Sequence, residues 1–225
     1  MAQRPIYIPN WNPPFVKTKS IQFIWNPGFS IQQKQKNINA LHMAAKRANI
    51  DPVLEVSTKS EAEIGRRLSA FNLTFSHQGN KFTVEAAFQA SKVFEKGGPY
   101  LDFLQLSGRE IKKDERLKNS GLLMGFLFEE TRWELEPKTA FYDWLYLNAL
   151  VQNRELSLKL MQYSGFTDIE FNPQKSINCQ AKSCALFVSL YQQVLLTQAL
   201  TSKQEFLEVL NKGQGGQSGE QFSLL

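Results

Sequence analysis

The sequence predicts a mainly α-helical protein with a few short strands, folded as one compact domain behind an N-terminal extension. Apolar residues recur at helical spacing along much of the chain, and Ser, Thr or Asn precedes several of these segments, as at helix N-termini. Residues 181–200 (AKSCALFVSLYQQVLLTQAL) are apolar almost all round, so we expect them to form the central buried helix. With 225 residues, 42% of them hydrophobic, the chain is long enough to bury one core.

Residues 1–50 are the predicted extension. Residues 1–29 contain five prolines and several aromatic side chains, which predicts irregular, extended chain that packs against the domain. Residues 30–49 follow as a helix that begins after Ser30. This helix is basic, with Lys34, Lys36, Lys46 and Arg47.

Residues 51–200 are the predicted compact domain. Residues 51–58 (DPVLEVST) look like a strand, and residues 61–75 like a short helix that leads through a turn into another strand. Further helices are expected over residues 83–96, 100–121, 140–152, 154–164 and 181–200. Residues 122–133 are apolar and fit a strand or a helix equally well. Residues 212–225 are rich in Gly, Gln and Ser, which predicts a disordered tail.

The composition favours a globular protein of the cytoplasm. The net charge of +5 suits an anionic partner such as nucleic acid, although ordinary cytosolic proteins often carry a similar charge. Cys179 and Cys184 lie far along the chain from both histidines, so we expect two reduced core thiols and no metal site. The N-terminus does not resemble a signal peptide, and no apolar run approaches the ~18 residues that a membrane span needs. We therefore expect no cofactor and no membrane contact.

One predicted helix combines an apolar face with a polar stripe. In residues 83–98 (TVEAAFQASKVFEKGG), Thr83 precedes the helix and two glycines end it. At about 100° per residue, Glu85, Gln89 and Lys92 fall on one arc, opposite the small and apolar side chains. Two helical turns rise ~10 Å, so Glu85 and Lys92 could reach one ligand placed over Gln89. The alternative is a solvated polar surface, which periodicity alone favours.

Other common catalytic motifs are absent from the sequence. It has no GxxxxGK[ST] loop and no GxGxxG motif after a strand, and neither His42 nor His77 has a Ser or Cys in a recognisable catalytic arrangement. The polar stripe is therefore the candidate site.

The motifs around this stripe resemble the NADAR family. The segments LSAFNLTF and VEAAFQASKVF are similar to that family's Ser-Asn-Phe turn and to the Glu-containing helix that follows it. Further along, SGRE at 107–110 resembles its Gly-Arg segment, and residues 147–173 resemble its Leu-Leu-x-Thr-Gly-x-x-x-Ile/Val-Glu pattern, placing Gly165, Ile169 and Glu170. The resemblance covers residues 53–192 with the motifs in family order, and it implies a compact, mostly helical domain.

The closer resemblance is to the NADAR antitoxins found beside DarT-type toxins. It rests on PFVKTKSIQFIWNPGFSIQQKQKNINALH, KTAFYDWLYLNAL and NPQKSINCQA. Those toxins resemble ADP-ribosyltransferases that modify DNA bases. The resemblance implies an antitoxin that removes ADP-ribose from guanine bases of DNA by cleaving the N-glycosidic bond. The implied partners are ADP-ribosylated DNA, single-stranded or locally opened, and a cognate DarT-type toxin, with no metal or cofactor.

The resemblance also implies which residues form the site. Glu85 and Lys92 would be catalytic. The expected substrate-binding residues are Ser69, Phe71, Asn72, Gln89, Arg109, Trp133 and Asn178. Trp133 is preferred over Trp144 as the ligand-lining Trp of the family, and Asn178 lies nearest to the place of a family acidic residue.

The sequence departs from the family at two of its motif positions. Ala70 stands where the family carries Asn, with Asn72 two positions further on. Ala86 replaces the His that follows the helix glutamate. Without a clear acidic residue near Asn178, the second catalytic position is open.

The implied chemistry assigns a role to each polar group. An N-glycoside breaks through a cation-like transition state, which the carboxylate of Glu85 would stabilise while an acid assists the departing base. Lys92 would hold the pyrophosphate or the carboxylate as an ammonium, or form a Schiff base as a neutral amine if its pKa falls from ~10.4. Gln89 suits ribose hydroxyls and Arg109 suits a pyrophosphate.

Each of these assignments has a structural alternative. Arg109 would be one of several solvated cations, Phe71 and Trp133 would be core residues, and Asn178 would cap a helix. We expect the basic helix at 30–49 and the cations of residues 109–118 to contact DNA phosphates. The alternative functions are a non-catalytic antitoxin that binds its toxin, and an N-glycosidase of a small metabolite like those of the riboflavin pathway.

Overall fold

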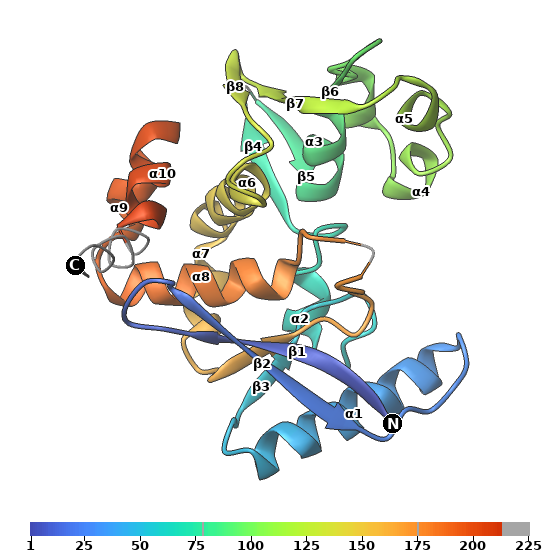
Figure 1. Cartoon of the computed structure of the whole chain (residues 1–225), viewed down its shortest axis with the longest axis vertical. Coiled ribbons are helices and arrows are strands. Elements are labelled where there is room, and N and C mark those ends of the chain that lie inside the picture. The colour runs from blue at the N-terminus through green and yellow to red at the C-terminus, as the bar shows by residue number, and fades with distance from the viewer. Residues whose placement is uncertain (78, 175, 213–225) are drawn as a thin grey trace, which may run out of the picture.

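The computed structural model describes residues 1–77, 79–174 and 176–212, and these residues form an α/β protein (Figure 1). The prediction of a mainly α-helical fold is wrong, because helices hold 42% and strands 20% of the residues, in mixed sheets. Many of the strands have only three or four residues. Such strands are too short to show an alternating pattern, and some of them, such as β3 and β9, pair with segments far along the chain.

The N-terminal residues form a β-hairpin. β1 (Ala2–Pro9) pairs antiparallel with β2 (Val16–Phe23), although these residues were expected to be irregular. β1 also pairs with β9 (Gly165–Thr167), which lies parallel to β3 (Val53–Glu55), giving the strand order β2-β1-β9-β3. The N-terminal hairpin and the later part of the chain thus share one sheet.

α1 (Ile31–Arg47) covers one side of the hairpin (Figure 1). Its N-cap is Ser30, as predicted, because the Ser30 side chain accepts a hydrogen bond from the Gln33 N–H. Ile38, Leu41 and Ala45 lie on one face at helical spacing. They pack into a core cluster with hairpin side chains, including Ile6, Ile21 and Phe23.

The predicted helix at 83–96 is shorter in the structure. After α2 (Glu63–Arg67) and the hairpin of β4 (Thr74–His77) and β5 (Asn80–Thr83), α3 spans Val84–Ala90. Lys92–Phe94 then form β6, which pairs with β7 (Leu123–Phe128), and β7 pairs with β8 (Thr131–Trp133). The Leu127 N–H of β7 donates a hydrogen bond to the carbonyl of Ser91. The chain therefore pairs as a strand from this point, where the sequence pattern favoured another turn of helix.

The predicted helix at 100–121 is also divided. It consists of a 3₁₀ helix, η1 (Leu101–Gln105), followed by α4 (Gly108–Ile111) and α5 (Arg116–Asn119). Ser107 and Glu110 form a capping box, so a new helix starts inside the predicted one.

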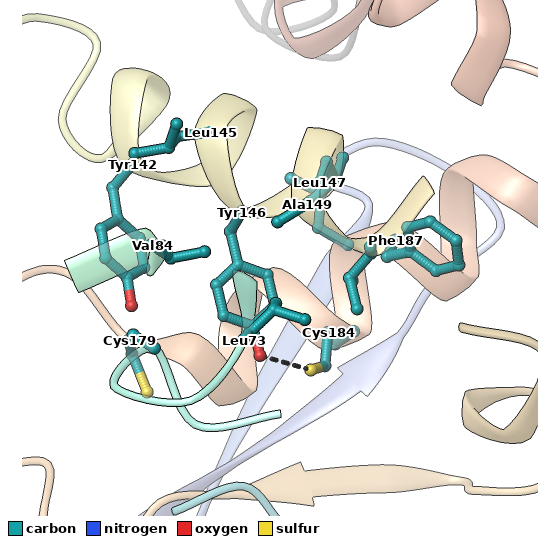
Figure 2. Close-up of a cluster of buried hydrophobic side chains, with 14 of the residues drawn as sticks. Leu73, Val84, Tyr142, Leu145, Tyr146, Leu147, Ala149, Cys179, Cys184 and Phe187 are labelled. Atoms are coloured by element: carbon teal, nitrogen blue, oxygen red, sulfur yellow. Dashed lines mark hydrogen bonds between the residues drawn. The ribbon is translucent and has the colours of Figure 1, made fainter. Parts of the chain in front are cut away.

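The core lies around α8 (Gln180–Gln192), which crosses the middle of the molecule (Figure 1). The prediction of a central buried helix is confirmed for α8, which packs against α6 (Ala140–Gln152) and β1. Shorter helices complete this region: α7 (Arg154–Leu160), α9 (Leu196–Ala199) and α10 (Lys203–Asn211). Figure 2 shows Tyr146 of α6 bonded to Cys184 of α8 within this core. Cys179 and Cys184 are buried free thiols, as predicted.

Two further predictions concern the ends and surroundings of the chain. The predicted tail falls almost wholly on residues 213–225, which lie outside the described residues. Across the described ranges, none of the helices is long and apolar enough to span a membrane.

Candidate functional site

Two cavities meet at Glu85, in the first turn of α3. The larger, of about 750 Å³, lies between α3, β7, the start of α6 and the loop at 173–178. The smaller, of about 480 Å³, lies beside the turn at 69–71 and the loop at 168–172. Glu85, Tyr142, Ser176 and Asn178 line both cavities. Both volumes are in the range of small-molecule sites, so a ligand with two parts could extend across Glu85.

Local hydrogen bonds fix the position of Glu85. The Thr83 side chain accepts a hydrogen bond from the Ala86 N–H and so caps the start of α3, two residues before Glu85. The backbone N–H of Glu85 donates to the carbonyl of Ala70 (2.9 Å), and the Ala70 N–H donates to the Gln180 side chain (2.7 Å). The turn at 69–71 and the first turn of α3 are thereby tied to α8.

The polar stripe predicted from the sequence lines the larger cavity. Gln89 donates through Nε2 to Oε1 of Glu85 (3.1 Å). Its own Oε1 is buried without a hydrogen-bond partner among the described residues, which leaves an acceptor for a ligand hydroxyl. Lys92 reaches the same cavity from β6, and its Nζ lies 5.2 Å from the centre of the Phe88 ring.

Burial and the nearby Glu85 carboxylate act in opposite directions on the pKa of the Lys92 amine. Burial lowers the pKa of Lys92 from its usual value, while the negative charge of Glu85 opposes this shift. Within the described chain, Lys92 has no salt bridge within 4.0 Å. A lowered pKa makes a lysine a better nucleophile at neutral pH.

The smaller cavity combines an aromatic face with polar groups. Phe71 is 38% exposed, and the Lys112 Nζ lies 4.7 Å from the centre of its ring. Gly108 also lies against this ring, since a Cβ there would stand 2.6 Å from a Phe71 ring carbon. The Ser69 hydroxyl is buried, and no described residue forms a hydrogen bond with it.

Two site residues were missed in the sequence. Asp168 lines the smaller cavity, where Oδ1 accepts from the N–H groups of Glu170 and Phe171 and Oδ2 from Gln180. Burial raises the pKa of Asp168 and of its buried neighbour Glu55. Tyr142 lines both cavities. Both residues lie in segments of the sequence that resemble the family. Asp168 lies two residues before Glu170 of the NADAR pattern, and Tyr142 lies inside KTAFYDWLYLNAL.

The remaining predicted residues are distributed as follows. Asn178 lines both cavities, whereas Asn72 lines a separate one and donates to the Arg66 carbonyl. Arg109 is exposed on α4 and lines neither of the two cavities at Glu85. Trp133 is 2% exposed and packs in the core against Phe141.

The two basic segments meet at the smaller cavity. Lys112 lines it, and Glu170, which also lines it, forms salt bridges with Lys34 of α1 (3.7 Å) and with Lys59 (3.9 Å). Arg116, by contrast, is paired with Asp102 and Asp114. Within the described ranges, His, Cys, Asp and Glu side chains form no group of three or more that could hold a metal ion.

One family model matches almost the whole chain. It is described as NADAR-DarT1, DarT1-associated NADAR antitoxin, and the match covers residues 2–220. This range includes the N-terminal hairpin and α1 as well as both cavities at Glu85. No curated protein gives a significant match.

Proposed function

The chain belongs to the family of DarT1-associated NADAR antitoxins, and from this premise we propose that it is a glycohydrolase that removes ADP-ribose from guanine bases of DNA. It thereby reverses the damage done by a DarT-type ADP-ribosyltransferase toxin. The observation that carries the proposal is the position of Glu85, a carboxylate at the junction of two cavities. A scissile bond placed there would have one half of the substrate on each side.

The larger cavity suits the ADP-ribose half. It has the greater volume, and the rings of Phe88, Phe126 and Phe141 give it an aromatic wall for adenine. Lys138 lines it as the candidate for holding the pyrophosphate, and Gln89 offers its free acceptor to the ribose hydroxyls.

The smaller cavity suits the guanine half. Phe71 offers a face on which a base can stack, and such stacking is worth about 1–3 kcal/mol per base. Glu170 is an acceptor for the N–H donors of guanine, and its negative charge disfavours a pyrophosphate in this cavity. Lys112, Lys34 and Lys59 lie around the same cavity and suit the phosphates of a DNA strand.

The proposed reaction uses Glu85 and Lys92. The anomeric carbon gains positive charge as the C–N bond breaks, and the Glu85 carboxylate stabilises this charge and orients water. The ribose ring opens as the proton of the guanine-linked nitrogen passes to the ring oxygen, leaving an imine at C1. Lys92 acts as a neutral amine that attacks this C1, a role favoured by its burial, and its proton passes through Glu85 to the guanine nitrogen as the C–N bond to guanine breaks, which leaves a Schiff base on Lys92. Water then hydrolyses the Schiff base and frees ADP-ribose and the lysine.

The direct test uses an oligonucleotide that carries ADP-ribose on one guanine. We expect the wild-type protein to release free ADP-ribose and Glu85→Gln to release it at least 100-fold more slowly, because the amide cannot balance the developing charge. Equal rates would remove Glu85 from the catalytic centre. No release by the wild-type protein would contradict the glycohydrolase; the non-catalytic antitoxin would then be tested by whether Glu85→Gln still blocks the toxin.

A further inference from the structure

Tyr142 occupies the junction of the two cavities together with Glu85. Four side chains line both cavities, namely Glu85, Tyr142, Ser176 and Asn178. Glu85 as a carboxylate only accepts hydrogen bonds, so a donor at this junction must come from the other three. Ser176 is exposed and Asn178 is half-buried, whereas Tyr142 is 6% exposed. Tyr142 is therefore the donor that is held in place at the junction.

The ring of Tyr142 is fixed while its hydroxyl is unused. The ring packs edge-on against Phe88 of α3 at a centroid distance of 5.2 Å, and it lies 6.1 Å from the ring of Tyr146. Figure 2 shows the two tyrosines in succession along α6, and only the Tyr146 hydroxyl is drawn in a hydrogen bond. Among the residues that the structure describes, none forms a hydrogen bond with the Tyr142 hydroxyl. A hydroxyl without a protein partner, on a side chain that lines two cavities, is suited to a ligand.

The proposed reaction needs such a donor. When the C–N bond breaks, its electron pair passes into the guanine, whose nitrogen and carbonyl oxygen gain negative charge. A fixed donor aimed at this charge lowers the barrier more than a mobile or solvated one. The sequence did not identify which residue assists the departing base.

We infer that Tyr142 is a catalytic residue whose hydroxyl donates a hydrogen bond to the departing guanine; this inference rests on the proposed glycohydrolase function. The proton stays on Tyr142 throughout. The proton that Lys92 loses when it attacks C1 passes through Glu85 to the guanine nitrogen, and water then hydrolyses the Schiff base, so that the products are ADP-ribose, free Lys92 and guanine in DNA. Burial, together with the charge of Glu85, raises the pKa of Tyr142 well above 10, which keeps the donor protonated at any physiological pH.

The test compares Tyr142→Phe with Tyr146→Phe. Tyr142→Phe removes only the hydroxyl and keeps the ring contacts, so we expect an unchanged melting temperature and a kcat lowered about 100-fold on the ADP-ribosylated oligonucleotide, with little change in KM. Tyr146→Phe is the matched control. Its hydroxyl donates to the Leu68 carbonyl (2.5 Å), so the control should lose stability and keep kcat within a few-fold.

A second substrate separates assistance to the leaving group from a structural role. ADP-ribose linked to p-nitrophenol has a leaving group that departs without help, so Tyr142→Phe should cleave it at nearly the wild-type rate. Equal kcat for wild type and Tyr142→Phe on the guanine substrate, or an equal loss on both substrates, would overturn the inference. If the wild-type protein releases no ADP-ribose from the oligonucleotide, the proposed function fails first and independently of Tyr142.

Discussion

Gln180 accepts a hydrogen bond from the backbone N–H of Ala70 at 2.7 Å, across 110 residues of sequence. Its Nε2 donates to the Val56 carbonyl and to Asp168, so all the polar atoms of this side chain are used. Ala70 stands where the NADAR family carries Asn, and its carbonyl accepts from the N–H of Glu85. The start of α8 thus holds the turn that positions the candidate catalytic carboxylate.

Removing this contact should affect stability and activity together. Ala70 is 3% exposed, so Gln180→Leu leaves its N–H buried without a partner. We expect the free energy of unfolding to fall by about 2–3 kcal/mol in urea denaturation, and the release of ADP-ribose to fall with it. Gln193→Leu is the control, since Gln193 is partly exposed and bonds only backbone carbonyls. An equal loss in both variants would contradict a special role of the Gln180–Ala70 contact.

Lys92→Arg separates the two roles open to Lys92. Arginine keeps the positive charge but cannot form a Schiff base, so we expect at least a 100-fold loss of activity. Reduction with borohydride during turnover should add the mass of ADP-ribose to the wild-type protein and not to Lys92→Arg. Because burial lowers the pKa of Lys92, the wild-type rate should rise with pH and level off below the usual lysine value. Full activity in Lys92→Arg would exclude the covalent role.

Gly108→Ala tests whether Phe71 binds the base. The new methyl group would stand 2.6 Å from a ring carbon of Phe71, and this half-exposed ring is free to swing away. Alanine is favourable in a helix, so we expect stability to change by less than about 1 kcal/mol while KM for the DNA substrate rises several-fold. Combined with Phe71→Ala, Gly108→Ala should add nothing further to KM. Additive effects would show that Gly108 does not act through Phe71.

Lys112 should contribute to DNA binding through its charge. Lys112→Gln should weaken binding of a single-stranded oligonucleotide, and the slope of log K against log salt should decrease in magnitude by about 0.7–1. The rate with an ADP-ribosylated nucleoside, which has no flanking phosphates, should stay close to that of the wild type. Lys17→Gln changes an exposed cation of β2 that lies outside both basic segments and lines neither cavity at Glu85, and it serves as the control. The same salt slope for wild type and Lys112→Gln would contradict a phosphate contact.

His42 should make the protein less stable in mild acid. Its Nε2 lies 2.9 Å from the Thr167 hydroxyl, and burial lowers its pKa to about 4. The unfolded chain binds this proton near pH ~6.5, so stability is complete above that pH and falls as pH decreases toward 4. Between pH 7 and pH 4.5 we expect the free energy of unfolding to drop by about 2 kcal/mol more in wild type than in His42→Asn.

The comparison between these two proteins isolates His42, because the buried carboxyls Glu55 and Asp168 titrate in both. Parallel pH profiles for wild type and His42→Asn would contradict the prediction.

Local features of the sequence determined part of this structure. A hydroxyl cap forms within one turn, so Ser30 and Thr83 marked the starts of α1 and α3. The apolar pattern of residues 181–200 predicted a buried helix because burial on all sides removes the usual polar face. Helical spacing placed Glu85 and Gln89 on one stripe, and the structure brings them together at a cavity.

Only the tertiary structure decided the rest. Lys92 reaches the cavity from a strand, because pairing with β7 replaced the last turn of the predicted helix. The sheet that joins the N-terminal hairpin to β9 depends on residues about 160 positions apart, such as Tyr7 and Phe166, and no local pattern encodes such pairing. Tyr142 and Asp168 line a cavity together with Glu85 although they lie far from it in the sequence. Their position depends on how α6, α8 and α3 pack, which is a property of the whole core.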